Sequence, residues 1–219
     1  MSFSRTEKRG TYSIDYLNSN HLSRQNTNDA MDAPWPQWLI NSFVSANQPQ
    51  FATDESVYHG PYTRLLYCLF GLESPSEITP QYHIPRTPRD SIDVVAFFTV
   101  ELDKHPVFFI EVKAPASFTL DSKRKQADDR MRDHFRDLRH NLVTSRLPGI
   151  SAFGTRMAFY EYVAATNTLT PRTIYPDPDS LNDVAPAERW SYDLLEANGI
   201  AQTRQVAEDV KAMCQALNN

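Results

Sequence analysis

The sequence predicts an α/β fold in which helices flank a central mixed β-sheet. Two segments rich in Val, Ile and Phe follow each other closely at 91–102 and 105–113, as strands of one sheet do. A long amphipathic helical pattern follows them at 120–146, and shorter helical patterns open and close the folded part of the chain. Helices packed against such a sheet bury the apolar side of every element.

The first part of the chain predicts an arm followed by two helices. Residues 1–33 are polar and weakly patterned, so we expect a flexible N-terminal arm ahead of a single domain at 34–219. Apolar residues at helical spacing predict a short helix at 35–44. A second helix is expected within 53–71, with Gly71 as its C-terminal stop.

The sheet is expected to contain further strands beside the two main ones. A short strand is predicted at 81–84, and the short LDKH segment between the two main strands predicts a hairpin turn. The remaining elements follow in order: a helix at 120–146, a strand at 154–166, a short strand at 189–195 and a helix at 205–217.

Composition narrows the class of protein. Hydrophobic residues make up 41% of the 219 residues, enough for a sizeable core, and no apolar run is long enough to cross a membrane. The N-terminus lacks the apolar segment of a secretory signal, and Cys68 and Cys214 have no metal-ligand spacing. We therefore expect an intracellular protein, cytoplasmic or nuclear, with both cysteines reduced in the core and no membrane partner. The histidines also lack zinc spacing.

Charge restricts how the protein can hold a nucleic acid. The chain has 22 basic and 27 acidic residues, a net charge of −5. A protein with this net negative charge is not expected to bind nucleic acid over its whole surface, so an anionic substrate would require a local basic patch.

The hairpin places opposite charges at one end of a largely apolar face. Because side chains alternate along a strand, Glu111 and Lys113 share a face, and pairing about the turn brings Asp93 beside them. Burying two carboxylates and an ammonium is costly without compensation. A divalent cation compensates: the carboxylates of Asp93 and Glu111 with a backbone carbonyl, that of Val112, suit Mg²⁺ (or Mn²⁺). Lys113 would then position a water or steady negative charge.

Two ordinary explanations compete with a metal site at this hairpin. The charged strand ends can simply contact water. A Glu111–Lys113 or Asp93–Lys113 salt bridge at the surface would stabilise the protein only slightly.

The same residues resemble the PD-(D/E)XK nuclease superfamily over roughly 51–165. Asp93 is followed, after seventeen residues, by Glu111-Val112-Lys113 at the ends of a hairpin that precedes a helix. The resemblance implies a restriction-endonuclease-like α-β-β-β-α-β core, metal-dependent hydrolysis of nucleic-acid phosphodiesters, metal ligation by Asp93 and Glu111, and a catalytic role for Lys113. Family members often add an acid on the preceding helix, which here is Glu55, with Glu73 as a second candidate.

The resemblance extends beyond the core and also has departures. The closing part of the chain, from residue 189, is similar to uncharacterised fungal proteins that carry this core. Ile92 stands where the family's proline would be, and Gln126 is followed four residues later by Arg130 in place of the tyrosine of one subfamily.

The long helix supplies candidate substrate contacts. Residues at its start lie nearest the predicted metal site, and we expect them to bind substrate: Lys123, Arg124, Lys125 and Gln126. The wider basic stripe along the helix is either a track for a phosphate backbone or a solvated face with ion pairs between residues four apart. Glu55 has a second interpretation as an acid that complements a helix dipole.

Three functions remain open from the sequence. The first is a nuclease-like enzyme with a bound metal. The second is a protein that has kept the nuclease fold without turnover and binds nucleic acid or protein. The third is a structural α/β module whose N-terminal arm recruits a partner. Nucleic acid, a second copy of the chain and a protein held by the arm are the partners considered.

Overall fold

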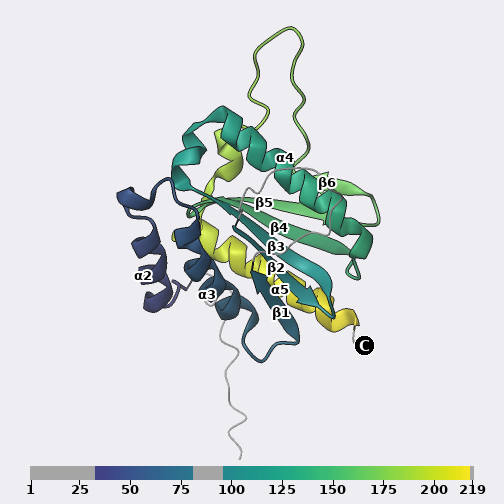
Figure 1. Ribbon diagram of the computed structural model, residues 1–219. Coiled ribbons are helices and arrows are strands. Elements are labelled where there is room, and N and C mark those ends of the chain that lie inside the picture. Colours follow the sequence, from purple (N-terminus) through teal and green to yellow (C-terminus); the bar gives the residue numbers. More distant parts are fainter. Residues whose placement is uncertain (1–32, 81–95, 218–219) are drawn as a thin grey trace, which may run out of the picture.

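A computed structural model describes residues 33–80 and 96–217 and arranges them in three layers around one β-sheet (Figure 1). The sheet has seven strands in the order β1-β2-β3-β4-β5-β6, with β7 paired to β5. Helix α4 covers one face, and α3 and α5 cover the other, with α2 packed beside α3. The predicted class, an α/β fold with a mixed sheet flanked by helices, is confirmed.

The helices ahead of the sheet begin and end close to the predicted positions. Helix α2 spans Gln37–Ala46, and a short 3-10 turn, η2 (Ser56–Tyr58), leads into α3 (His59–Phe70). Gly71 follows α3 with φ of 80°, a conformation that favours glycine, and so acts as the predicted C-terminal stop. Another 3-10 turn, η1 (Pro49–Phe51), lies between α2 and η2.

The predicted hairpin is confirmed. Strands β2 (Ala96–Leu102) and β3 (His105–Lys113) pair antiparallel, with Phe97 opposite Glu111. The turn residues Asp103 and Lys104 both have positive φ, as tight two-residue hairpin turns require. Strand β1 (Ser76–Pro80) pairs with β2. The strand expected at 81–84 and the first residues of the one expected at 91–102 lie outside the described residues, as do residues 1–32 of the expected arm.

The long helix is shorter than predicted, and the strand after it was missed. Helix α4 (Asp121–Leu138) ends in a 3-10 turn, η4 (Arg139–Asn141), and β4 (Arg146–Phe153) then pairs parallel to β3. The prediction of helix up to residue 146 was therefore wrong at its C-terminal end. The sequence did not predict β4 because Pro148 and Gly149 are residue types that are uncommon inside strands.

The last part of the chain differs from prediction in its strands. Strand β5 (Arg156–Val163) lies within the predicted 154–166, and β6 (Thr168–Thr170) follows it at the edge of the sheet. The strand predicted at 189–195 is present only as the two-residue β7 (Tyr192–Asp193), because a 3-10 turn, η5 (Ala187–Trp190), precedes it. The C-terminal helix α5 (Ala197–Leu217) begins earlier than predicted.

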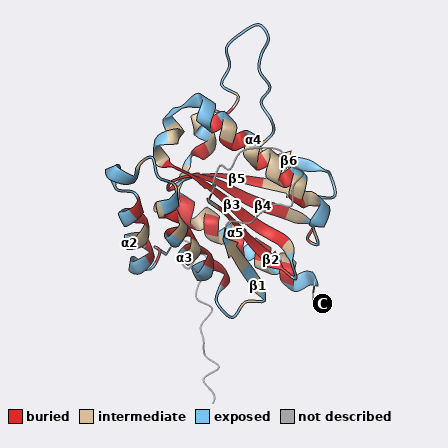
Figure 2. Cartoon of the chain, in the orientation of Figure 1, coloured by how far each residue is buried: buried red, intermediate tan, exposed pale blue. Residues whose placement is uncertain are grey.

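The two faces of the sheet bury separate apolar clusters, as the alternation along β2 and β3 predicts (Figure 2). Phe97 and Phe109 pack under α4, whereas Phe98 and Phe108 pack against the helices of the opposite layer. Cys214 is buried as expected, but Cys68 is exposed, so its predicted place in the core is wrong.

Candidate functional site

The C-terminal end of β3 carries a buried pair of opposite charges. Glu111 and Lys113 point to the α4 side of the sheet, and their side chains are 0% and 9% exposed. The Lys113 Nζ lies 3.0 Å from Glu111 Oε1. Because the Glu111 side chain is fully buried, the explanations that place these charges at the surface, in contact with water, are wrong for Glu111.

Helix α4 adds a residue to this pair that the sequence analysis did not select. His134 Nε2 lies 3.4 Å from Glu111 Oε2, and the imidazole packs on Phe97 with ring centroids 4.4 Å apart. The histidines lack metal-ligand spacing, so the sequence does not single out His134. One feature of the sequence could have pointed to His134: it stands four residues after Arg130, so both side chains lie on one side of the helix.

The acid predicted on the preceding helix also lies at this site. Glu55 directly precedes η2, is half-buried, and accepts a hydrogen bond from the backbone N–H of Ala114. Burial raises the pKa of Glu55. The charges of Lys113 and Arg130 oppose the rise, and the charge of Glu111 adds to it. The structure therefore brings Glu55, Glu111 and Lys113 together, as the sequence predicts.

Backbone contacts hold the segment of Glu55 against the end of β3. Ala116 N–H donates to Ala52 O at 2.9 Å, just after Pro115 ends the strand and begins the 3-10 turn η3 (Pro115–Thr119). Gly154 N–H donates to Lys113 O at 3.0 Å and fixes the same strand end from the β4–β5 turn. The site is thus built on the rigid end of a central strand.

The electrostatics of Glu111 are unusual for a buried carboxyl. Burial would raise its pKa, but Lys113 and His134 outweigh this effect and hold the pKa of Glu111 at about 2. Within the described residues, neither carboxylate oxygen of Glu111 has a hydrogen bond of good geometry, and neither ring nitrogen of His134 has one. Buried polar atoms in folded proteins are nearly always hydrogen-bonded, so these four atoms identify a place where a bound species can sit.

Of the other residues of the predicted metal site, Val112 is described and Asp93 is not. Val112 packs its side chain into the cluster on the opposite face and pairs with Ala96 and Ala152 in the sheet, so only its backbone belongs to this end of β3. Asp93 lies outside the described residues. Glu73, the weaker acidic candidate, lies in the exposed turn after α3.

The carboxylates at this site are of the ligand type that a hard cation prefers. Glu111 offers two oxygens without hydrogen bonds, and Glu55 adds a nearby carboxylate, both of the ligand type that Mg²⁺ and Mn²⁺ take. Within residues 33–80 and 96–217, however, no three His, Cys, Asp or Glu side chains form a group that could hold a metal ion. A metal here would need a further ligand from outside the described residues, for which Asp93 is the predicted candidate.

The residues at the start of α4 that are predicted to bind substrate have contacts within the protein. Arg124 is buried and anchors a later loop: it donates to Ala185 O at 2.9 Å and Asp183 Oδ2 at 2.7 Å. Lys125 forms an exposed ion pair with Asp129, and Lys123 contacts Gln126 at 3.4 Å. Of these four residues, Arg124 is the buried one, and its guanidinium binds residues of a later loop.

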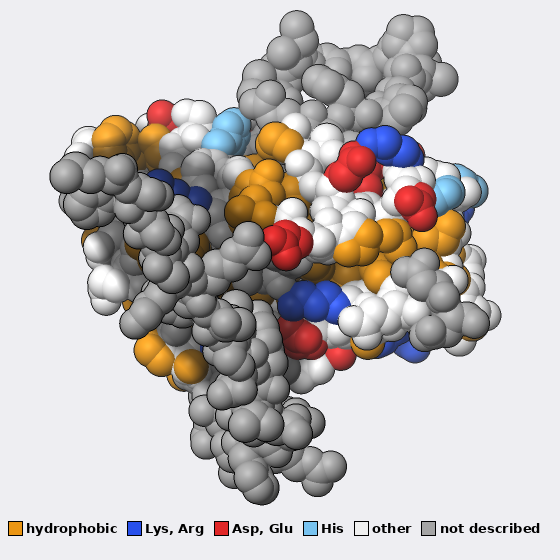
Figure 3. Space-filling model, turned by 90° about the horizontal axis from the view of Figure 1, so that it is seen from below, with side chains coloured by type: hydrophobic (Ala, Val, Ile, Leu, Met, Phe, Trp, Pro, Cys, Tyr) orange, Lys and Arg blue, Asp and Glu red, His pale blue; other side chains and the backbone are white. Residues whose placement is uncertain are grey.

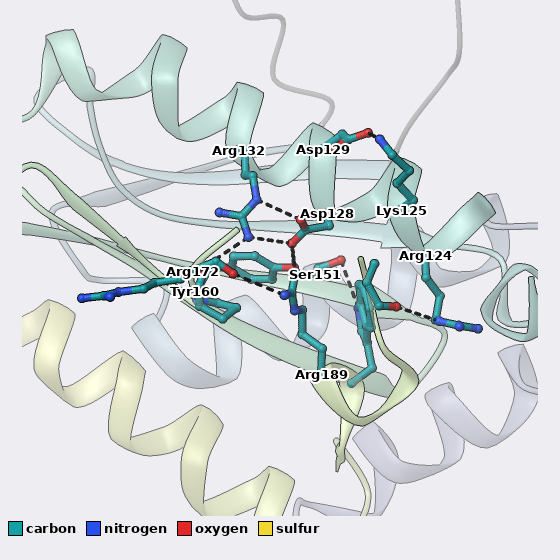
Figure 4. A network of polar contacts seen from close by, with 12 residues as sticks. Arg124, Lys125, Asp128, Asp129, Arg132, Ser151, Tyr160, Arg172 and Arg189 are labelled. Carbon is teal, nitrogen blue, oxygen red and sulfur yellow. Dashed lines mark hydrogen bonds and ion pairs between the residues drawn. The ribbon is translucent and has the colours of Figure 1, made fainter. Parts of the chain in front are cut away.

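A second buried carboxylate on α4 anchors the chain after β6 (Figure 4). Asp128 accepts hydrogen bonds from the Tyr160 hydroxyl at 2.7 Å and from Arg132 Nε at 2.8 Å, and it also pairs with Arg189. The two guanidinium groups further donate to the carbonyls of Pro171 and Arg172. This network joins α4, β5, η5 and the base of the loop before η5.

The surface is mixed in charge. Along α4, Lys125, Arg132 and Arg136 pair with acids on the same helix, which favours the solvated-face interpretation of the basic stripe. On the coloured part of the face in Figure 3, acidic and basic side chains lie beside one another among apolar ones. Among the residues that the structure describes, no helix has the length and hydropathy needed to span a bilayer.

Comparisons with protein-family models, with curated proteins and with solved structures find no match for this chain.

Proposed function

We propose that the protein is a metal-dependent nuclease-like enzyme that hydrolyses phosphodiester bonds of nucleic acid. The observation that carries the proposal is the buried Glu111–Lys113 pair at the end of β3, whose carboxylate oxygens have no hydrogen bond of good geometry within the described residues. Further support comes from Glu55 beside that pair and from the order of elements α3, β1, β2, β3, α4, β4, which agrees with the α-β-β-β-α-β core implied by the PD-(D/E)XK resemblance.

The residues have separate tasks in this proposal. Glu111, Glu55 and Asp93 would hold Mg²⁺ or Mn²⁺, which supplies a Lewis acid for a phosphoryl oxygen and lowers the pKa of a bound water. Lys113 keeps an ammonium at the site and steadies negative charge that develops on the phosphate. His134 fixes the Glu111 carboxylate through its contact at 3.4 Å, and the Phe97 ring holds the imidazole in place.

A catalytically silent relative of this fold is the second candidate. The observation that favours it is that Glu111 is fully buried and already compensated by Lys113 and His134. Such a site is charge-balanced without a metal, so a protein that binds nucleic acid or another protein could keep it for stability alone.

A cleavage assay separates the two candidates. Single-stranded DNA, duplex DNA and RNA would be incubated with the protein and Mg²⁺ or Mn²⁺, using wild type, Glu111→Gln and Lys113→Met. The matched control is Glu101→Gln, because Glu101 is a buried acid of the same hairpin that accepts a hydrogen bond from Thr79 at 2.9 Å.

The enzyme proposal predicts cleavage by wild type and Glu101→Gln, with a loss of at least about 100-fold in Glu111→Gln and Lys113→Met. No cleavage of any substrate by folded wild type would favour the silent protein. Equal cleavage by wild type and Glu111→Gln would remove Glu111 from the mechanism.

A further inference from the structure

A groove of about 480 Å³ lies between α2 and α3, away from the charged pair of β3. Its lining includes apolar side chains as well as hydroxyl, amide and guanidinium groups. The lining residues that matter here are Trp38, Ser42, Ser45, Phe51, Val57 and Arg64. The groove therefore combines an aromatic surface with a few polar groups, as small-ligand sites do.

The aromatic side chains of the groove are exposed. Trp38 is 49% exposed and Phe51 is 37% exposed, whereas the other two tryptophans, Trp35 and Trp190, are buried at 3% and 0%. Large aromatic rings usually lie in the core or against a partner, and an exposed indole offers a flat face for stacking.

The charge of the groove favours an anionic ligand. Arg64 has no ion pair or hydrogen bond with the described residues, and no acid lines the groove. This situation differs from the rest of the surface, where the arginines and lysines of α4 pair with acids. A guanidinium that has no partner among the described residues, in a groove also lined by an indole, suits a ligand that carries both a planar ring and a phosphate.

The groove adjoins the candidate active site through one short segment. Phe51 and Val57 line the groove, while Glu55 between them reaches the backbone of Ala114 at the end of β3. The hydrogen bond from Ala116 N–H to Ala52 O fixes this segment between the two places. A ligand in the groove and a phosphodiester at Glu55 would thus lie on two sides of the same turn.

We propose that this groove binds an unpaired nucleotide of a single-stranded nucleic acid that flanks the phosphodiester at the Glu111 site. The base stacks on Trp38, Arg64 holds a backbone phosphate, and the hydroxyls of Ser42 and Ser45 face the ligand. The proposal rests on the nuclease-like function. It makes single-stranded nucleic acid the substrate class, because a base inside a duplex cannot reach the indole.

The test uses the fluorescence of Trp38, the exposed member of the three tryptophans. Full-length protein in EDTA, which prevents hydrolysis, is titrated with a short single-stranded oligonucleotide, the same sequence as a duplex, and a nucleoside monophosphate. Arg64→Ala keeps the fluorophore and removes the cation. Trp38→Leu is followed by the anisotropy of a labelled oligonucleotide.

Two substitutions serve as matched controls outside the groove. Tyr67→Leu removes another exposed aromatic of α3, and Arg136→Ala removes an exposed guanidinium of α4. We expect the single strand to quench Trp38 and the duplex to leave it unchanged. Arg64→Ala and Trp38→Leu should each weaken single-strand binding by about fivefold or more, and the controls should bind as wild type does.

Several results would overturn the proposal. Single-strand binding that is unchanged in both groove variants would exclude the groove. Equal quenching by the monophosphate and the oligonucleotide would make it a site for a free nucleotide. A change of sedimentation without a change of nucleotide binding would make it an interface between copies of the chain.

The two proposals fail separately. Quenching in EDTA does not depend on hydrolysis, and Glu111→Gln should retain it. Quenching without cleavage in Mg²⁺ or Mn²⁺ would reject the nuclease proposal and leave single-strand binding intact. Cleavage without quenching would reject the groove alone.

Discussion

Two acids, Asp128 and Glu111, are buried between α4 and the same face of the sheet, at 4% and 0% exposure, yet their surroundings differ. Asp128 receives hydrogen bonds from Tyr160 and Arg132 and pairs with Arg189 (Figure 4). Glu111 has charge contacts with Lys113 and His134 but no well-formed hydrogen bond within the described residues.

The difference separates a structural carboxylate from a candidate functional one. A buried charge with all its oxygens hydrogen-bonded stabilises one arrangement of the chain around it. Glu111 is compensated by the charges of Lys113 and His134, but its oxygens lack hydrogen bonds of good geometry within the described residues, and proteins keep such groups mainly where something else binds. On this ground we assign Asp128 to the fold and propose that Glu111 belongs to a functional site.

The largest expected effect is at the structural carboxylate. Asp128→Asn leaves Arg132 and Arg189 without their counter-charge and should lower the free energy of unfolding by about 3–5 kcal/mol. The free energy of unfolding is measured by urea titration, with circular dichroism as the signal. A loss below about 1 kcal/mol would mean that the network in Figure 4 is not what anchors the chain after β6.

Acid should reveal the charge balance at Glu111. Its pKa is lowered from 4.5 to about 2 in the folded protein, so its contribution to stability is complete above pH 4.5 and is lost as the pH falls toward 2. Lys113→Met removes a cation that lowers this pKa, so the acid-induced loss should be smaller in the variant and should end at a higher pH. The measurement is the unfolding free energy against pH for wild type and variant.

The difference between the two curves reports on Glu111 and Glu55, the two acids whose pKa values the charge of Lys113 lowers. Identical curves would show that Lys113 does not set the ionisation of Glu111.

The Glu111–Lys113 pair should show coupling in a double-mutant cycle. Each single variant, Glu111→Gln or Lys113→Met, leaves one buried charge without its partner, whereas the double variant leaves neither. The double variant should therefore recover about 1–4 kcal/mol relative to the sum of the singles. Additive losses in thermal or urea unfolding would contradict the contact at 3.0 Å.

The smallest effect is expected at an exposed ion pair of the same helix. Lys125 pairs with Asp129 while its side chain remains 51% exposed. Lys125→Met should change the unfolding free energy by only about 0.3–0.5 kcal/mol. A larger loss in the same urea experiment would mean that an exposed ion pair of α4 stabilises the protein as much as a buried one. That result would contradict the comparison between buried and exposed charges.

The pairing of Glu111 with Lys113 could be predicted because it depends on local rules. Residues two apart on a strand share a face, and the apolar pattern of β3 identifies the strand. The hairpin and the separation of Phe97 and Phe98 to opposite faces follow from the same alternation.

Features that depend on distant contacts could not be predicted. Gly149 in β4 lies under the Phe109 ring, where a Cβ atom would be 2.7 Å from a ring carbon, so the glycine serves packing that only the fold reveals. Arg124 was expected to bind substrate, but its acceptors Asp183 and Ala185 come about sixty residues later. His134 meets Glu111 only because α4 crosses back over β3.

The most direct test of the central claim is calorimetric titration of Mn²⁺ and Mg²⁺ into wild type, Glu111→Gln and Glu101→Gln. If Glu111 is buried to hold a ligand, wild type and Glu101→Gln bind the metal, and Glu111→Gln stays folded but does not. Absence of binding to wild type, or equal binding by Glu111→Gln, would contradict the claim and leave Glu111, like Asp128, as a part of the fold.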